Sequence, residues 1–191
     1  MKLMMWGLAL GVLILGCGPW LQSCWGLKDK EPNVAWDRIK QMGQLANLTY
    51  SEDKAIIEEY GDKAWIKVIE DQQVKLVMVT DDVKGEHWLG IRGTANTHNA
   101  LMDAQYSKEI DSKLGAYFHK GFHRLAKAAY DEFTPRLKPG YKIWVTGHSL
   151  GGAGAAILAM YYFQEDRGLE QCITFGQPKV TNEKGVKKFW D

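Results

Sequence analysis

A serine between two glycines, in the sequence GHSLG at positions 147–151, is the feature that most constrains how this chain can fold. The KIWVT segment before it has the β-branched and aromatic content of a buried strand, and the small, apolar residues after it are typical of a buried helix. A G-x-S-x-G motif between a strand and a helix indicates a sharp turn that exposes the serine hydroxyl as a nucleophile. Side chains two positions before and after Ser149 would collide in such a turn, and Gly147 and Gly151 avoid that collision.

The expected helix after Ser149 also matters for chemistry. Its first backbone N–H groups and the positive end of its dipole would face the serine, where they favour a developing oxyanion. Adjacent residues on such a turn generally point apart. We therefore expect His148 to pack or to form hydrogen bonds, and not to act as the general base for Ser149.

The rest of the chain alternates between strand-like and helix-like segments, and its 191 residues suit one domain. In the second half this alternation predicts crossover connections and a mainly parallel central sheet flanked by helices. Asp71 and Gln72 suit a turn, which predicts an antiparallel hairpin at one edge, and Asn33 and Ser51 are expected to cap helices. The expected helices are 34–45, 51–60, 118–137 and 150–163, and the expected strands are 64–69, 74–80, 87–91, 141–146 and 172–175.

Composition excludes several classes of protein. Lysine and arginine number 24 against 23 aspartate and glutamate residues, so the net charge is only +1 and gives no reason to expect nucleic acid as a partner. The hydrophobic fraction of 46% is enough for an ordinary globular core. No cysteine and histidine cluster has the spacing of metal ligands, so we expect neither a metal nor an organic cofactor.

The first 27 residues differ from the rest of the chain. Lys2 precedes an apolar run over 3–15, and Gly16 follows it. A positive start, an apolar run of this length and a small residue before a cleavage point are typical of a secretory signal. The run is too short to span a bilayer alone, but apolar residues resume after it, so an uncleaved membrane anchor is the alternative. We predict a leader or anchor over 1–27 and one folded domain over 28–191.

Two cysteines in this leader refine the prediction. The sequence ILGC, ending at Cys17, resembles a bacterial lipobox, in which the cysteine is lipidated and becomes the mature N-terminus. The sequence LQSC, ending at Cys24, resembles one too, but Cys17 directly follows the apolar run and is preferred. The alternative is a plain hydrophobic leader whose cysteines have no special role. We thus expect a secreted protein or a membrane-anchored lipoprotein of a bacterial cell envelope, attached to the membrane through its N-terminus.

Four motifs together resemble one family, the class 3 (fungal-type) lipases of the α/β-hydrolase fold. The resemblance covers about residues 33–190, and the motifs agree with the family in order and spacing. Thr181 and Lys179 stand where the family has Gly and Arg, and Phe118 replaces its Val. The four motifs are GHSLGG at 147–152, IRGT at 91–94, FHKGF at 118–122, and FGQPKV at 175–180 followed by Asn182.

The resemblance implies a role for each site residue. Ser149 would be the nucleophile, and the backbone N–H of Leu150 together with the backbone and hydroxyl of Thr94 would form the oxyanion hole. Asp103 stands where the family has an Asp that orients this hydroxyl, although a surface carboxylate is an equal alternative. His119 is expected to be structural, because its neighbours fit a packed helix face.

The sequence also departs from the family, whose triad order is Ser, Asp, His. No histidine follows His148, and the only aspartates after Ser149 are Asp166 and Asp191, neither at the family position. A serine hydroxyl is a weak nucleophile without a base. We therefore expect the printed chain to be a C-terminally truncated α/β-hydrolase with little turnover and with an open sheet edge at the strand near Phe175.

These observations lead to one function and two alternatives. The expected function is a serine ester hydrolase that acts on acylglycerols, related lipid esters or small soluble esters. The first alternative is an inactive lipase-like lipoprotein that binds acyl ligands or a protein partner, and the second is an acyltransferase with the same turn. The family places an apolar lid with a Trp after the second oxyanion donor. Ala100 stands at that position, so we expect weaker activation at lipid interfaces.

Overall fold

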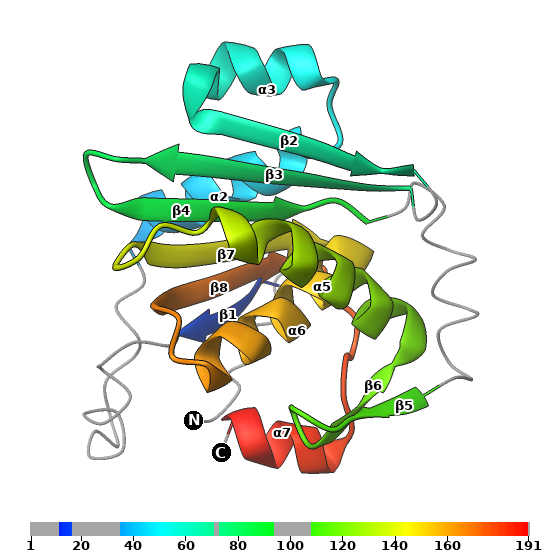
Figure 1. Cartoon of the computed structure of the whole chain (residues 1–191). Helices are drawn as coiled ribbons and strands as arrows, with labels where there is room; N and C mark the ends of the chain where they lie inside the picture. Colours follow the sequence, from blue (N-terminus) through cyan, green and yellow to red (C-terminus); the bar gives the residue numbers. More distant parts are fainter. Residues whose placement is uncertain (1–11, 17–34, 71–72, 94–107, 191) are drawn as a thin grey trace.

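A six-stranded sheet forms the centre of the molecule (Figure 1). The computed structural model describes residues 12–16, 35–70, 73–93 and 108–190, and only the backbone of residues 12–16 and 190. The strands lie in the order β1-β8-β7-β4-β3-β2. Their bounds are β1 Val12–Gly16, β2 Ala64–Ile69, β3 Val74–Asp81, β4 Glu86–Ile91, β7 Lys142–His148 and β8 Leu169–Phe175.

The sheet is mixed and not mainly parallel as expected. Strands β4, β7 and β8 run parallel to one another, whereas the β1–β8, β2–β3 and β3–β4 pairings are antiparallel. The two consecutive hairpins β2–β3 and β3–β4 have connections too short for a crossover, which makes that side antiparallel. The expected edge hairpin is present, with Ile69 opposite Val74, although Asp71 and Gln72 themselves lie outside the described residues.

Helices cover both faces of the sheet (Figure 1). Alternate residues of one strand point to opposite faces, so Leu76 and Met78 pack against the α5 and α6 side, while Val77 and Val79 pack against the α2 side. Each face therefore has its own apolar core. The helices are α2 Trp36–Leu48, α3 Asp53–Tyr60, α5 Lys120–Phe133, α6 Leu150–Gln164 and α7 Glu183–Trp190, with short 3-10 turns at Gly61–Lys63 and Thr134–Arg136.

Two details of the expected helices are wrong. Ser51 does not cap α3, whose N-cap is Glu52 without a side-chain hydrogen bond. The long helix does not begin at Phe118, because Phe118 lies in a strand and His119 is the N-cap of α5, accepting a hydrogen bond from the Gly121 N–H. Asn33, the expected cap of the first helix, lies outside the described residues; α2 begins after Ala35.

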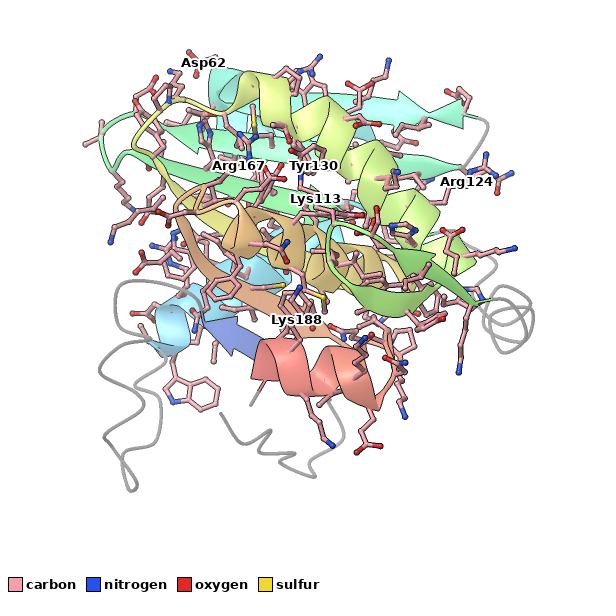
Figure 2. The ribbon with its side chains drawn as sticks, turned by 60° about the horizontal axis from the view of Figure 1, so that its bottom comes forward. Asp62, Lys113, Arg124, Tyr130, Arg167 and Lys188 are labelled. Carbon is pink, nitrogen blue, oxygen red and sulfur yellow. The ribbon has the colours of Figure 1, made fainter. Side chains whose placement is uncertain are left out.

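A separate two-stranded hairpin, which the sequence did not predict, precedes α5. Its strands are β5 Lys108–Asp111 and β6 Ala116–His119. The Glu165 carboxylate at the end of α6 binds Lys113 of the hairpin turn, Arg167, and the hydroxyl of Tyr130 on α5. Figure 2 shows these three partners side by side. Hydrogen bonds from them outweigh the burial that opposes ionisation, and the pKa of Glu165 is lowered.

A buried polar cluster fastens the same hairpin to the helices. The imidazole of His123 on α5 contacts the carboxylates of Glu109 and Asp111 on β5, with 2.9 Å between Nε2 and the Asp111 Oδ2. The Tyr161 hydroxyl of α6 donates to the same Asp111 oxygen at 2.6 Å, and the Leu114 N–H donates to Oδ1. Burial opposes the Asp111 charge, but these donors outweigh it and lower the pKa of the carboxyl.

The edge of β8 is not open as expected. Strand β1 pairs with it antiparallel, with Val12 opposite Phe175 and Gly16 opposite Gln171. This strand covers the end of the apolar run that the sequence assigned to a leader, together with Gly16. A short apolar segment suits a strand as well as a signal. Among the residues that the structure describes, no helix is long and apolar enough to cross a membrane.

Candidate active site

Ser149 occupies the single residue between β7 and α6. Its backbone has φ 53° and ψ −121°, a left-handed conformation that non-glycine residues rarely adopt and that costs about 1–3 kcal/mol. Two hydrogen bonds hold it: the Ser149 N–H donates to the Phe175 carbonyl at 2.9 Å, and the Ser149 carbonyl accepts from the Ala153 N–H at 3.1 Å. The residue is 9% exposed, so this strained turn lies just below the surface.

Three glycines allow the backbone to close around Ser149. A Cβ on Gly147 would lie 2.4 Å from the Gly151 oxygen, and one on Gly151 would lie 2.1 Å from the Ile91 oxygen of β4. A Cβ on Gly93, just after β4, would lie 2.6 Å from the Leu150 Cβ and 2.8 Å from the Gly151 N. All four distances are shorter than the 3.0 Å below which real Cβ contacts essentially never occur. The turn therefore depends on Gly93 as well, a role that sequence reasoning missed although Gly93 was part of the quoted IRGT motif.

The start of α6 presents backbone donors beside Ser149. Leu150 is the first residue of the helix, where N–H groups have no partner within the helix and the dipole is positive. Gly93 packs against Leu150 and brings the end of β4 to the same place. The two other expected residues, Thr94 and Asp103, lie outside the described residues, as does Cys17 of the leader.

The described histidines do not supply a base to Ser149. His87 contacts the Thr80 hydroxyl and accepts from the Lys138 N–H, and burial together with the charge of Lys138 lowers its pKa. His123 lies in the cluster with Asp111, and His119 caps α5. Among residues 35–70, 73–93 and 108–190, none forms a hydrogen bond with the Ser149 hydroxyl.

His148 contacts a residue that the sequence did not single out. Its Nδ1 and its carbonyl oxygen each lie 3.3 Å from the Tyr50 hydroxyl, and the two rings meet edge to face at 5.9 Å between centroids. This agrees with a hydrogen-bonding role for His148. Burial raises the pKa of Tyr50, while a hydrogen bond from the Gly93 backbone and the charge of Arg92 act in the other direction. No sequence motif includes Tyr50, which only follows the end of α2.

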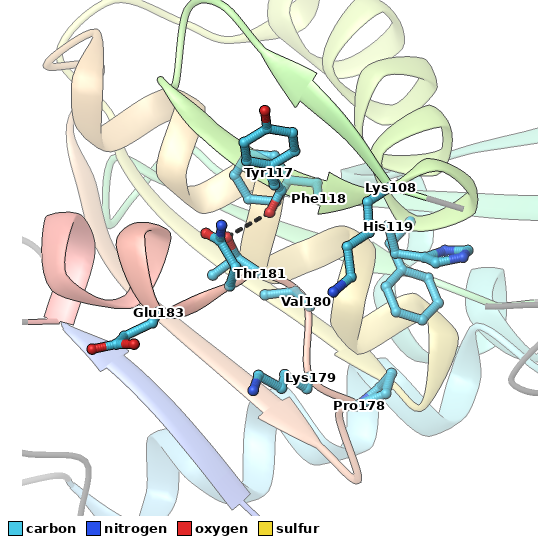
Figure 3. Close-up of a pocket in the computed structure, with 11 residues that line it drawn as sticks. Lys108, Tyr117, Phe118, His119, Pro178, Lys179, Val180, Thr181 and Glu183 are labelled. Carbon is cyan, nitrogen blue, oxygen red and sulfur yellow. Dashed lines mark hydrogen bonds between the residues drawn. The ribbon is translucent and has the colours of Figure 1, made fainter. Parts of the chain in front are cut away.

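A cavity in the described part of the chain lies elsewhere, between the start of α5 and the segment that follows β8 (Figure 3). Its volume is about 430 Å³, and Ser149 is not among its lining residues. Thr181, which stands where the family has a glycine, closes one side by donating to the Tyr117 carbonyl at 2.7 Å. The described residues contain no group of three or more histidine, cysteine, aspartate or glutamate side chains able to hold a metal ion.

Comparison with known proteins places this geometry in a family. The family model "Lipase (class 3)" matches residues 88–190, which include most of β4, the Ser149 turn and the segment after β8. The lipase of Rhizomucor miehei is 29% identical over 162 residues, or 78% of this chain and 40% of that protein. The "Secreted mono- and diacylglycerol lipase 1" of Fusarium solani is 31% identical over 117 residues, or 56% of this chain and 34% of that protein.

Solved structures agree on the fold. The lipase from Rhizopus microsporus var. chinensis superposes with a TM-score of 0.66 at 23% identity, covering 81% of this chain and 62% of that one. The Lip2 lipase from Yarrowia lipolytica gives 0.65 at 21% identity, covering 81% and 65%. The chain thus spans 40% or less of those two curated relatives and about two thirds of these structures. The fold is that of the α/β-hydrolases, and the chain belongs to the class 3 lipase family.

Proposed function

We propose that this protein is a serine carboxylic ester hydrolase and that Ser149 is its nucleophile. The observation that carries the proposal is the strained backbone of Ser149 between β7 and α6, which only surrounding glycines and hydrogen bonds sustain. Strain of this kind at the junction of a strand and a helix suits a residue whose hydroxyl must stand clear of its neighbours.

The reaction would proceed through an acyl-enzyme. The Ser149 oxygen attacks the ester carbonyl while a base takes its proton, the alcohol leaves from the tetrahedral intermediate, and water then releases the acid. The Leu150 N–H at the start of α6 would stabilise the oxyanion. Thr94 would supply the second donor with Asp103 orienting its hydroxyl, a proposal that the packing of Gly93 against Leu150 supports, since Thr94 is the next residue. Removing one such donor typically costs about 10²–10³ in rate.

The proposed substrates are acylglycerols or related lipid esters. The support is the printed function of relatives, a lipase and a secreted mono- and diacylglycerol lipase. The name of the Fusarium solani relative describes it as secreted, which supports an extracellular location for this protein. Membrane attachment through a lipidated Cys17 is the finer proposal, and mass spectrometry of the mature N-terminus tests it.

The test is hydrolysis of p-nitrophenyl esters and of monoacylglycerol and diacylglycerol by the product of the whole reading frame. Ser149→Ala should reduce the rate at least about 10⁴-fold, because the oxyanion hole alone gives little catalysis. Ser112→Ala, on the exposed hairpin turn, is the matched control and should keep the wild-type rate. Hydrolysis that survives Ser149→Ala, or a wild-type protein that cleaves none of these esters, would contradict the proposal.

A further inference from the structure

Tyr50 has an unusual combination of features. Its side chain is 39% exposed, yet the backbone on both sides of it is firmly held. Thr49 before it is fully buried, with its methyl group against Gly90 of β4, where an added Cβ would lie only 3.0 Å away. The Ser51 carbonyl after it accepts from Lys75 Nζ at 2.8 Å. A ring this exposed, on backbone this firmly held, does not serve mainly to pack the core.

Helix α2 positions the backbone around Tyr50 over the ends of the three parallel strands. The Met42 carbonyl of α2 accepts from the Thr146 hydroxyl of β7 at 3.2 Å, and Gly43 lies against the ring of Phe175 at the end of β8. Tyr50 follows the C-terminus of α2 and therefore lies at the edge of the sheet where β4, β7 and β8 end. Its location is therefore determined by the same packing that determines Ser149.

The hydroxyl of Tyr50 acts on the peptide group that joins His148 to Ser149. Its oxygen lies 3.3 Å from the His148 carbonyl oxygen, to which it donates, while the N–H of the same peptide group donates to Phe175 at 2.9 Å. The two hydrogen bonds hold the peptide plane from opposite sides. Because the orientation of this plane sets φ of Ser149, they oppose the rotation that would release the strain at the serine.

The phenol oxygen of Tyr50 can also accept hydrogen bonds. A phenol can donate one hydrogen bond and accept two. With its proton on the His148 carbonyl, the oxygen can accept from His148 Nδ1, 3.3 Å away. One hydroxyl therefore contacts both the backbone and the ring of the residue that precedes Ser149.

We propose that Tyr50 is a positioning residue that clamps the His148–Ser149 peptide, so that the nucleophile is held in its strained conformation beside the Leu150 N–H at the start of α6. This inference rests on the proposed ester hydrolase function for its kinetic consequence. Its structural part does not depend on turnover. The hydroxyl itself need not touch the substrate, so loss of it should lower kcat and leave KM nearly unchanged.

Tyr50→Phe removes only the hydroxyl, and Tyr117→Phe is the matched control, because Tyr117 is 44% exposed on the β5–β6 hairpin. We expect Tyr50→Phe to lower kcat about ten-fold, the loss that one or two hydrogen bonds of ordinary strength would give, with KM within about two-fold. The urea midpoint should stay close to that of wild type. Tyr117→Phe should leave kcat, KM and the midpoint unchanged.

The outcomes separate the two proposals. If Ser149→Ala abolishes hydrolysis while Tyr50→Phe keeps the wild-type kcat, or raises KM alone, the role of Tyr50 is overturned and the ester hydrolase proposal stands. If wild type shows no hydrolysis, or Ser149→Ala retains it, the function proposal fails and amide hydrogen exchange decides about Tyr50. The clamp predicts about ten-fold faster exchange at the Ser149 amide in Tyr50→Phe only, and unchanged exchange there overturns it.

Discussion

Two adjacent glycines in the first turn of α6 provide a sharp test of how the site is built. Both Gly151 and Gly152 are helical and buried, so helix propensity alone predicts that alanine at either position stabilises the protein by about 1 kcal/mol. The structure predicts that the two substitutions have very unequal effects. A Cβ at Gly151 would lie 2.1 Å from the Ile91 oxygen and 2.8 Å from the Gly93 N, whereas a Cβ at Gly152 would meet its nearest neighbour, the Gly147 oxygen, at 3.1 Å.

The size of the effect follows from these distances. At Gly152 the neighbouring atoms must move by a few tenths of an ångström, and the gain in propensity roughly offsets that strain. At Gly151 the backbone of β4 must move by more than 1 Å relative to α6 to restore an ordinary contact of 3.4 Å or more. Backbone shifts of this kind cost about 3 kcal/mol or more, since neither neighbour is a flexible side chain. For a chain of this size, that loss lowers Tm by about 6–12 °C.

The assay is thermal and urea unfolding of Gly151→Ala and Gly152→Ala beside the wild-type protein, with ester hydrolysis measured on the same samples. Gly151→Ala should be the less stable variant by about 3 kcal/mol and should lose hydrolysis even where it remains folded, because α6 moves away from β4. Gly152→Ala should lie within about 1 kcal/mol of wild type. Equal stability of the two variants would refute the close approach of α6 to β4.

Three further predictions concern other parts of the molecule. Asp111 and Glu165 have pKa values below their usual 3.8 and 4.5, so the unfolded state takes up protons before the folded state does as pH falls. The stability that these two carboxylates contribute should therefore be complete above about pH 5 and should be lost as pH falls through their folded-state pKa values. Urea midpoints measured from about pH 3 to 7 test this, and a midpoint that rises in acid would contradict it. The polar segment after Gly93 predicts a small rate increase above the solubility limit of a lipid ester, and a large jump would contradict it. Cleavage before Cys17 would remove Val12–Gly16 from the edge of β8, so mass spectrometry of the mature protein should find either a lipidated N-terminus or β1, but not both.

The sequence allowed the Ser149 turn to be predicted well, and local chemistry explains why. Strand β7 and helix α6 match the expected segments closely, because the glycines, the β-branched residues before them and the small residues after them all favour the same local structure. The connection between β2 and β3 was equally local. These features need no information about distant parts of the chain.

Other features depended on contacts between distant segments. Phe118 shares a helical spacing with Phe122, but its burial comes from a strand in which Tyr117 is exposed and Phe118 is buried. The signal that would have revealed that hairpin is the D-S-K-L-G turn, in which Asp111 bonds the Leu114 N–H and Gly115 has a positive φ. Tyr50 gave no signal, because its partner His148 is 98 residues away in the chain.

The most direct measurement is the reaction of the whole-reading-frame protein with a fluorophosphonate, followed by peptide mass spectrometry. The account predicts one covalent adduct, on Ser149, that is absent from Ser149→Ala and forms more slowly in Tyr50→Phe. Unlabelled Ser149 in a protein that still hydrolyses esters, or an adduct on another residue that accounts for the activity, would contradict it.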